Sequence, residues 1–231
     1  RMRIDSAGRM LVNTTVSRIV EDHAGNGPQG KIQIEATNSD AIMSIISAGT
    51  LDANRSGTLS LGRHRNSTIG GTPTIVQNGD SLGAICFAGG DGTDMRTKAA
   101  KIVCEVDGTP GSNDVPGRLL FSTRSDGGSL AERLRITSDG KIGAGVTSPQ
   151  RNLHIHSSDS STNTYFQLTS ATTGSSSTDG FQLWAYGSGG NSNAALVQRE
   201  NADLEIWTNN TERMRLDSSG RLLVGHTSSS N

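Results

Sequence analysis

Short runs in which apolar and polar residues alternate cover most of the chain, and glycine-rich or Asp-Gly turns separate them. Alternation with a period of two predicts β-strands that each have one apolar face. The best helical stretch, residues 93–101, is short and equally compatible with a loop. The predicted strands are 31–36, 42–47, 58–62, 74–77, 82–88, 101–106, 117–123, 153–156, 165–169, 180–186, 194–199 and 204–208. The pattern therefore predicts an all-β chain.

One phrase occurs three times, beginning at Arg1, Arg133 and Arg213. Each copy has an Arg-apolar-Arg-apolar run, a turn that contains glycine, and a second short apolar run. We expect each copy to be a β-hairpin with its apolar pair on one side and both arginines on the other. Glycine suits the turn because it adopts a positive φ without a steric penalty.

These hairpins divide the chain into five parts. We expect a repeat hairpin at 1–17, a first β module at 18–131, a repeat hairpin and linker at 132–149, a second β module at 150–211, and a repeat hairpin with a C-terminal tail at 212–231. The expected architecture is a modular series of short-strand sandwiches and hairpins.

Composition indicates that one copy of the chain cannot build a large core. Only 32% of the residues are apolar and 3% are aromatic, which is low for a globular domain. Burial against further copies would supply what one subunit lacks. A net charge of -1 gives no electrostatic case for nucleic acid as a partner. No apolar run approaches the roughly 20 residues that span a bilayer, so membrane insertion is not expected.

The repeated phrase resembles the "ERMRIDSSGRVGIGTTSP" repeats of phage tail fibres and related virion structural proteins. The resemblance is carried by residues 132–149 and 212–227. Residues 79–83, 91–94 and 105–119 are similar to the module that commonly precedes that repeat. Such proteins are typically homotrimers, and many continue into an endosialidase-type intramolecular chaperone. The resemblance therefore implies an intertwined, elongated homotrimer.

The leading functional hypothesis is a structural component of a phage tail fibre, shaft or knob, that projects towards the host surface and helps attachment. Its partners would be other tail proteins and a host-surface glycan or protein receptor, and it would reside in the virion after assembly in the host cytoplasm. We expect no enzymatic activity and no cofactor. Two alternatives stay open: a tailspike-like glycan-degrading enzyme, which needs two carboxylates across a sugar cleft, and a segment of a bacterial trimeric adhesin.

The most distinctive chemical motif is the pair His154 and His156. A His-x-His on a strand places both imidazoles on one face, and three chains around an axis could offer six nitrogens to a transition metal. Against this, Leu153 and Ile155 are the natural core residues of that strand, which would turn the histidines to solvent. Exposed or hydrogen-bonded histidines are the plainer interpretation.

Six of the chain's eight aromatic residues lie between 165 and 207. Within that group, Trp184, Tyr186 and Trp207 are candidate contacts to a glycan or receptor, because exposed aromatic faces stack on apolar sugar surfaces. Burial in a trimer core is the plainer alternative, since Phe181 and Leu183 alternate with Trp184 and Tyr186.

Overall fold

The computed structural model describes residues 2–4, 10–12, 32–34, 43–45, 57–68, 70–159, 163–187 and 193–226. Every regular element within these ranges is a β-strand, which confirms the predicted all-β fold class. The chain divides into two compact units, residues 1–154 and 155–231. Within the described ranges, no helix is long and apolar enough to cross a membrane. The division into five parts by the hairpins stays a prediction.

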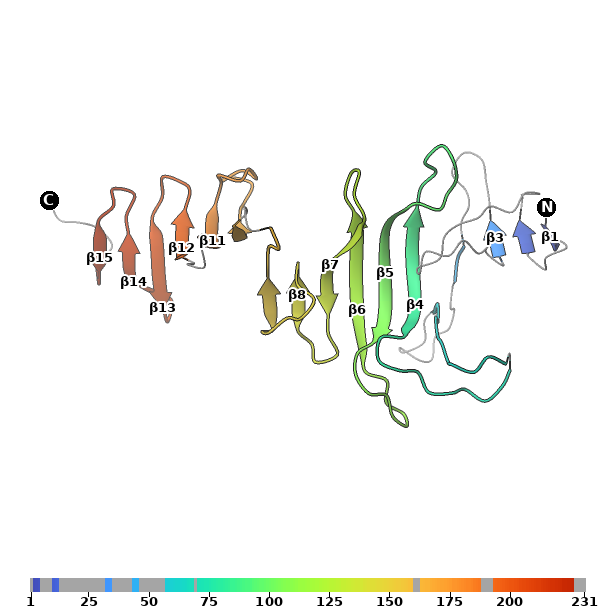
Figure 1. Ribbon diagram of the computed structural model, residues 1–231. Helices are drawn as coiled ribbons and strands as arrows, with labels where there is room; N and C mark the ends of the chain where they lie inside the picture. Colours follow the sequence, from blue (N-terminus) through green and yellow to red (C-terminus); the bar gives the residue numbers. More distant parts are fainter. Residues whose placement is uncertain are drawn as a thin grey trace, which may run out of the picture. The chain divides into compact units, whose positions relative to one another are not determined.

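The described part of unit 1 contains two sheets, and the last strand of the second ends at Ile155, the first residue of unit 2. A three-stranded sheet has the order β1-β2-β3, formed by Met2–Ile4, Met10–Val12 and Ile32–Ile34. A six-stranded sheet follows the chain in the order β4 to β9, with paired neighbours from β4 to β8 antiparallel (Figure 1). Its strands are β4 Ser81–Ala88, β5 Lys98–Val106, β6 Gly117–Arg124, β7 Leu130–Ile136, β8 Ile142–Ala144 and β9 Leu153–Ile155.

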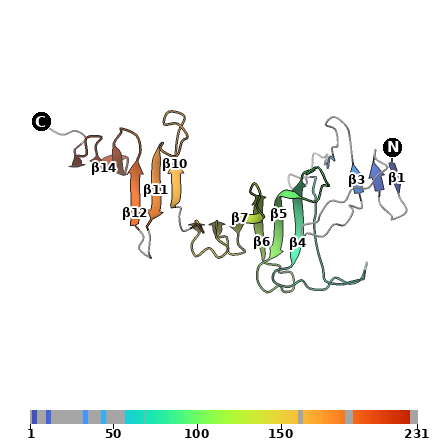
Figure 2. The same ribbon diagram turned by 45° about the horizontal axis from the view of Figure 1, so that its top comes forward.

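The described residues of unit 2 form two antiparallel three-stranded sheets, which Figure 2 shows from a second side. The first sheet consists of β10 Thr164–Leu168, β11 Phe181–Tyr186 and β12 Asn193–Gln198. The second consists of β13 Leu204–Thr208, β14 Thr211–Leu216 and β15 Leu222–Val224. A two-residue turn joins β13 to β14, and Asn209 and Asn210 both have positive φ values, as a type I′ hairpin turn requires.

All three copies of the repeat form the predicted hairpin in the same register. Residue 2 of each copy pairs with residue 12, as Met2 with Val12, Leu134 with Ala144 and Met214 with Val224. The turn glycines of the second and third copies, Gly140 and Gly220, have φ values of 79° and 81°. The phrase therefore specifies both the hairpin and its pairing.

Three predicted strands are wrong where the structure describes them. The described part of 42–47, and all of 58–62 and 74–77, are not in strands. The 57–68 segment instead passes close over β4, where a Cβ on Gly83 would lie 2.5 Å from the Cβ of Leu61. Asp80 holds this segment, since its carboxylate accepts two hydrogen bonds from Arg65, at 2.6 and 2.8 Å. The apolar residues of these segments alternate as in a strand, but no described strand pairs with them.

The core is small. Among the described residues, the buried hydrophobic side chains are Leu11, Val76, Val103, Val106 and Leu120, while 26 large hydrophobic side chains are exposed. A single chain thus leaves most of its apolar strand residues uncovered, as the composition predicted.

Candidate functional site

The repeat is a three-stranded unit in the second and third copies, and not only a hairpin. The strand before each hairpin pairs with it in the same way: Leu119 faces Ile136, and Leu204 faces Leu216. Both strand pairs also carry a register shift two residues further on, after Phe121 and after Ile206. The sequence signal that marks this strand is apolar residues at alternate positions followed by threonine, Leu-Leu-Phe-Ser-Thr at 119–123 and Leu-Glu-Ile-Trp-Thr at 204–208.

The register shift is a β-bulge at the first arginine of the repeat, and it sends the two arginines to different partners. Arg133 donates from Nε to Thr123 Oγ1 at 3.1 Å, on the face that also carries Leu119 and Phe121. Arg135 instead forms a bidentate ion pair with Glu132, at 2.6 and 2.7 Å. One extra residue in a strand lets side chains three apart share a face. The prediction that both arginines lie on one side is therefore wrong for this copy, and also for the third, where Arg213 donates to Thr208 and Arg215 to Glu212; Arg1 of the first copy lies outside the described residues.

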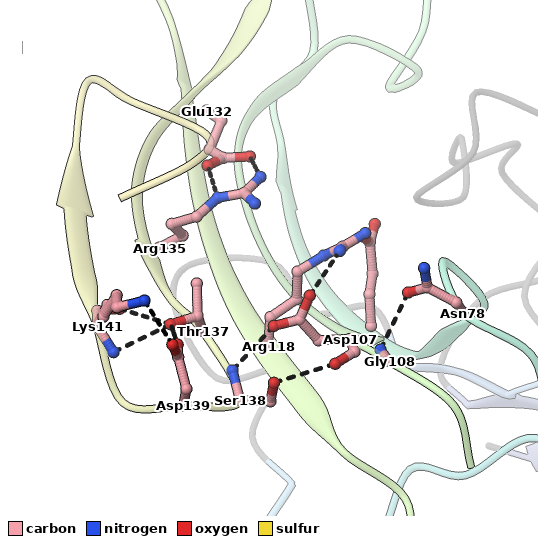
Figure 3. A network of polar contacts seen from close by, with 11 residues as sticks. Asn78, Asp107, Gly108, Arg118, Glu132, Arg135, Thr137, Ser138, Asp139 and Lys141 are labelled. Carbon is pink, nitrogen blue, oxygen red and sulfur yellow. Dashed lines mark hydrogen bonds and ion pairs between the residues drawn. The ribbon is translucent and has the colours of Figure 1, made fainter. Parts of the chain in front are cut away.

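Asp107 links strand β5 to the turn of the second hairpin (Figure 3). Its Oδ2 accepts a hydrogen bond from the backbone N–H of Ser138 at 2.9 Å, and its backbone carbonyl accepts one from the Ser138 hydroxyl at 3.0 Å. Its Oδ1 accepts a bond from Arg118 at 2.9 Å, and Arg118 also binds Glu105 at 2.8 and 3.1 Å. The ion pairs of Arg118 and Arg135 therefore cover the face of the sheet that carries Val103 and Leu120.

The third copy builds the same contact with the charges placed differently. Arg215 forms ion pairs with Asp203, Glu205 and Glu212. Asp203 also accepts the backbone N–H of Ser218, the counterpart of Ser138, at 2.9 Å. By strand register, Asp203 takes the position that Arg118 has in the second copy. In unit 2, Asp203 therefore binds the hairpin turn directly, whereas in unit 1 Arg118 binds Asp107 and Asp107 binds the turn.

Three of these carboxyl groups, Asp107, Glu212 and Asp139, have a lowered pKa. The backbone N–H of Ser138 is the largest cause for Asp107, and the Arg215 guanidinium lowers the pKa of Glu212. Hydrogen bonds from Lys141 and Thr137 lower the pKa of Asp139 to about 2. A hollow of about 510 Å³ lies beside this network, but its arginine, lysine and aspartate side chains pair with one another or with neighbouring carboxylates. We assign the network a structural role.

The opposite faces of the sheets are apolar and open. In β4–β8, the apolar face carries Ile85 and Phe87, which are 46% and 52% exposed, and continues through Ile136 and Ile142. Corresponding faces carry Met2, Ile4 and Ile32 in β1–β3; Phe166, Leu168, Leu183 and Leu196 in β10–β12; and Ile206, Leu216, Leu222 and Val224 in β13–β15. A contiguous apolar surface of this kind marks an interaction surface. We call these surfaces the open apolar faces.

The open apolar face of β10–β12 contains a shallow hollow of about 340 Å³. Small side chains, Thr164, Ala185 and Ala194, stand opposite one another across the three strands and form its floor. Phe166 and Leu196 lie beside it. The hollow can accept an apolar side chain from another molecule.

Three aromatic residues of the same sheet, Tyr165, Trp184 and Tyr186, gather on its other face. The Trp184 ring stacks on Tyr165, directly across from it on β10, and on Tyr186, with ring centroids 5.0 and 4.7 Å apart. The guanidinium of Arg199 lies 5.8 Å from the centre of the Trp184 ring. Tyr165 was not among the predicted contacts, although its place in the alternating run 165–169 would have put it across from a neighbouring strand.

The remaining predicted site residues lie apart from this cluster. Trp207 belongs to the β13–β15 sheet, is 55% exposed, and donates from Nε1 to Glu205 at 2.7 Å. His154 lies in β9, where its Nδ1 accepts the backbone N–H of Gln150, and His156 follows that strand. Leu153, expected in the core, is 55% exposed. No cluster of three or more His, Cys, Asp or Glu suited to a metal occurs among the described residues, and a site shared by three chains stays a prediction.

No protein-family model matches the sequence, and no curated protein does so either. The solved structures that are similar include two of a phage tail fibre. The carboxy-terminal domain of the bacteriophage T5 L-shaped tail fibre aligns with a TM-score of 0.39 and 12% identity, over 82% of this chain and 93% of that one. The same domain with its intramolecular chaperone domain aligns with a TM-score of 0.43 and 12% identity, over 80% of this chain and 63% of that one. These two structural neighbours are phage tail-fibre domains.

Proposed function

We propose that this protein is a structural component of a phage tail fibre, in its shaft or knob, and that it assembles as a homotrimer. The observation that carries the proposal is the same in all four sheets: one face is apolar and open. Burying apolar surface contributes about 25 cal/mol per Å², so these faces strongly favour association with further copies. The number three, and the tail-fibre class, come from the resemblance of the repeated phrase.

The role in attachment follows from this assembly. Several copies carried on one fibre present the same weak contact several times, and effective concentration makes the combined binding strong. In this proposal the protein resides in the virion, is assembled in the host cytoplasm, and contacts other tail proteins and a host-surface receptor. The resemblance adds that such segments often precede an intramolecular chaperone.

The alternative of a glycan-degrading enzyme has less support. A glycosidase needs a carboxylic acid whose pKa is raised, beside a second carboxylate. In the described residues, every carboxyl group whose pKa departs clearly from its ordinary value has a lowered pKa. These groups are held in turns or ion pairs, and they are Asp80, Asp91, Asp107, Asp139, Glu212 and Asp217. We propose that the chain has no hydrolytic activity, and release of oligosaccharides from host-surface glycans would refute this.

Light scattering after size-exclusion chromatography tests the assembly, and immunogold labelling tests the location. The proposal expects a trimeric mass, and antibodies against the chain on the tails of the particles that encode it. A stable monomer contradicts the assembly. Labelling of a bacterial surface in place of virion tails favours the adhesin alternative.

A further inference from the structure

The two faces of the β10–β12 sheet have different chemistry. One is the open apolar face, with Phe166, Leu183 and Leu196 in register across the three strands. The other carries Tyr165 and Trp184, again in register, together with Tyr186. If the open apolar face is covered by another copy of the chain, then the face with Tyr165, Trp184 and Tyr186 is directed away from that contact. We call it the aromatic face.

The aromatic face presents amphipathic rings to solvent. Tyr165 is 44% exposed and Tyr186 is 37% exposed, while Trp184 lies stacked against both. Stacking holds the rings in place, so little side-chain entropy remains to be lost when a ligand covers them. Tyr165 also accepts a hydrogen bond from Asn163 at its hydroxyl, at 3.0 Å, which leaves its own O–H to donate. Rigid rings with polar groups at their edges suit a flat ligand with apolar and hydroxylated surfaces.

The guanidinium of Arg199 lies next to these rings and is hydrogen-bonded to a neutral side chain. Arg199 donates from Nε and Nη2 to Gln182 Oε1, at 3.2 and 3.1 Å. Gln182 is 1% exposed and its amide donates to the Ser177 carbonyl at 2.8 Å, so the acceptor is firmly anchored. In contrast to Arg118 and Arg215, Arg199 forms no ion pair with any residue that the structure describes. Its charge is therefore not neutralised at this site.

We propose that the aromatic face binds an acidic saccharide. The carboxylate of a uronic or similar sugar pairs with Arg199, whose planar guanidinium matches carboxylate geometry. The apolar side of a sugar ring lies on Tyr186 or Tyr165. The inference rests on the proposed function, for which it specifies the class of receptor.

The same reasoning excludes Trp207 from this site. Although Trp207 is more exposed than either tyrosine, its indole N–H is bound to the Glu205 carboxylate. A carboxylate next to the ring repels an acidic sugar. Trp207 and Arg213 therefore provide matched controls in the neighbouring sheet: an exposed tryptophan, and an arginine whose Nε binds the neutral Thr208.

The test compares two tetrasaccharides by titration calorimetry or ligand-observed NMR with the full-length protein. A hyaluronan fragment is the acidic probe and maltotetraose is the neutral one. We expect the acidic probe to bind about tenfold more tightly, because a hydrogen bond to a charged group contributes more than a neutral one. The preference should decrease as salt is added. Equal affinity of the wild-type protein for the two probes, or no binding of the acidic probe, is enough to overturn the proposal.

Variants then assign the residues. Arg199→Gln should remove the preference for the acidic probe, Arg199→Lys should retain part of it, and Tyr186→Ala should weaken both probes. Trp207→Ala and Arg213→Gln should leave both affinities unchanged. An equal loss in Arg213→Gln and Arg199→Gln means that binding is diffuse attraction by positive charge, and refutes the site.

Light scattering on the same samples separates this inference from the proposed function. Trimers that bind neither probe overturn the acidic-saccharide site and leave the fibre assignment intact. A monomeric wild-type protein overturns the fibre assignment, whichever probe it binds.

Discussion

The contact between Asp107 and the turn at Ser138 gives the sharpest test of how the repeat is held. Replacing Asp107 with asparagine keeps the size of the side chain but leaves one acceptor oxygen for two donors, Arg118 and the Ser138 N–H. A hydrogen bond to a charged group contributes about 1.5–3 kcal/mol, and partial exposure places this one near the lower end. We expect a loss of about 1–2 kcal/mol, which makes exchange of the Ser138 amide hydrogen roughly 5–30 times faster.

The pH dependence follows from the lowered pKa of Asp107. Because the folded-state pKa lies below the unfolded value of about 3.9, this contribution to stability is present above that pH and is lost as pH falls through the folded pKa. The asparagine variant lacks this titration. The difference in urea stability between the wild type and Asp107→Asn should therefore be full at pH 7 and shrink below about pH 4.

Asp126→Asn is the matched control, since Asp126 is an exposed aspartate in the turn between β6 and β7. It should change neither the exchange of the Ser138 amide nor the stability at pH 7. Two results would refute the reasoning: protection of the Ser138 amide that is the same in the wild type and Asp107→Asn, or a stability difference that persists undiminished at low pH.

Three further predictions concern the turn, the bulge and the open apolar faces. Gly140→Ala should destabilise the protein by about 1 kcal/mol, measured as a lower Tm, because a residue with a side chain disfavours the φ of 79° at this position. Crowding is not the cause, since a Cβ at Gly140 would have no atom within 4 Å. Gly62→Ala is the control: its Cβ would be equally free of contacts, its φ is not positive, and its effect should be near neutral. Thr208→Val removes the acceptor of Arg213 and should reduce urea stability by about 0.5–1.5 kcal/mol, whereas an unchanged midpoint argues against the bulge contact. Leu222→Glu, on the open apolar face of β15, should yield smaller species in light scattering while strand content by circular dichroism is retained.

The strand pattern, the hairpins and the shortage of core could be predicted from the sequence, because each depends on neighbouring residues or on composition alone. Strand 82–88 is found at 81–88, and strand 204–208 is found with the same bounds. The stretch 93–101 did not become a helix, and its last residues begin β5. The strands predicted at 58–62 and 74–77 are wrong because an alternating apolar pattern does not by itself establish pairing with another strand.

The candidate surfaces were predicted less completely. Trp184 and Tyr186 do belong to one cluster, but Tyr165 and Arg199 join it through pairing between strands that are distant in sequence. Trp207 lies in another sheet. The alternation of Phe181 and Leu183 with Trp184 correctly separated two faces, although it did not show which face one chain leaves uncovered.

The repeated phrase by itself determined that three hairpins form and how each pairs, because its apolar residues alternate and its glycine permits the turn. The tertiary structure decided which side chains share a face, because Arg133 is an extra residue in β7 relative to β6. The bulge at Arg133 brings Glu132 and Arg135 to the same face, while Arg133 reaches Thr123. A period of two counted along the sequence cannot detect that shift, since a bulge is defined only against the strand with which it pairs.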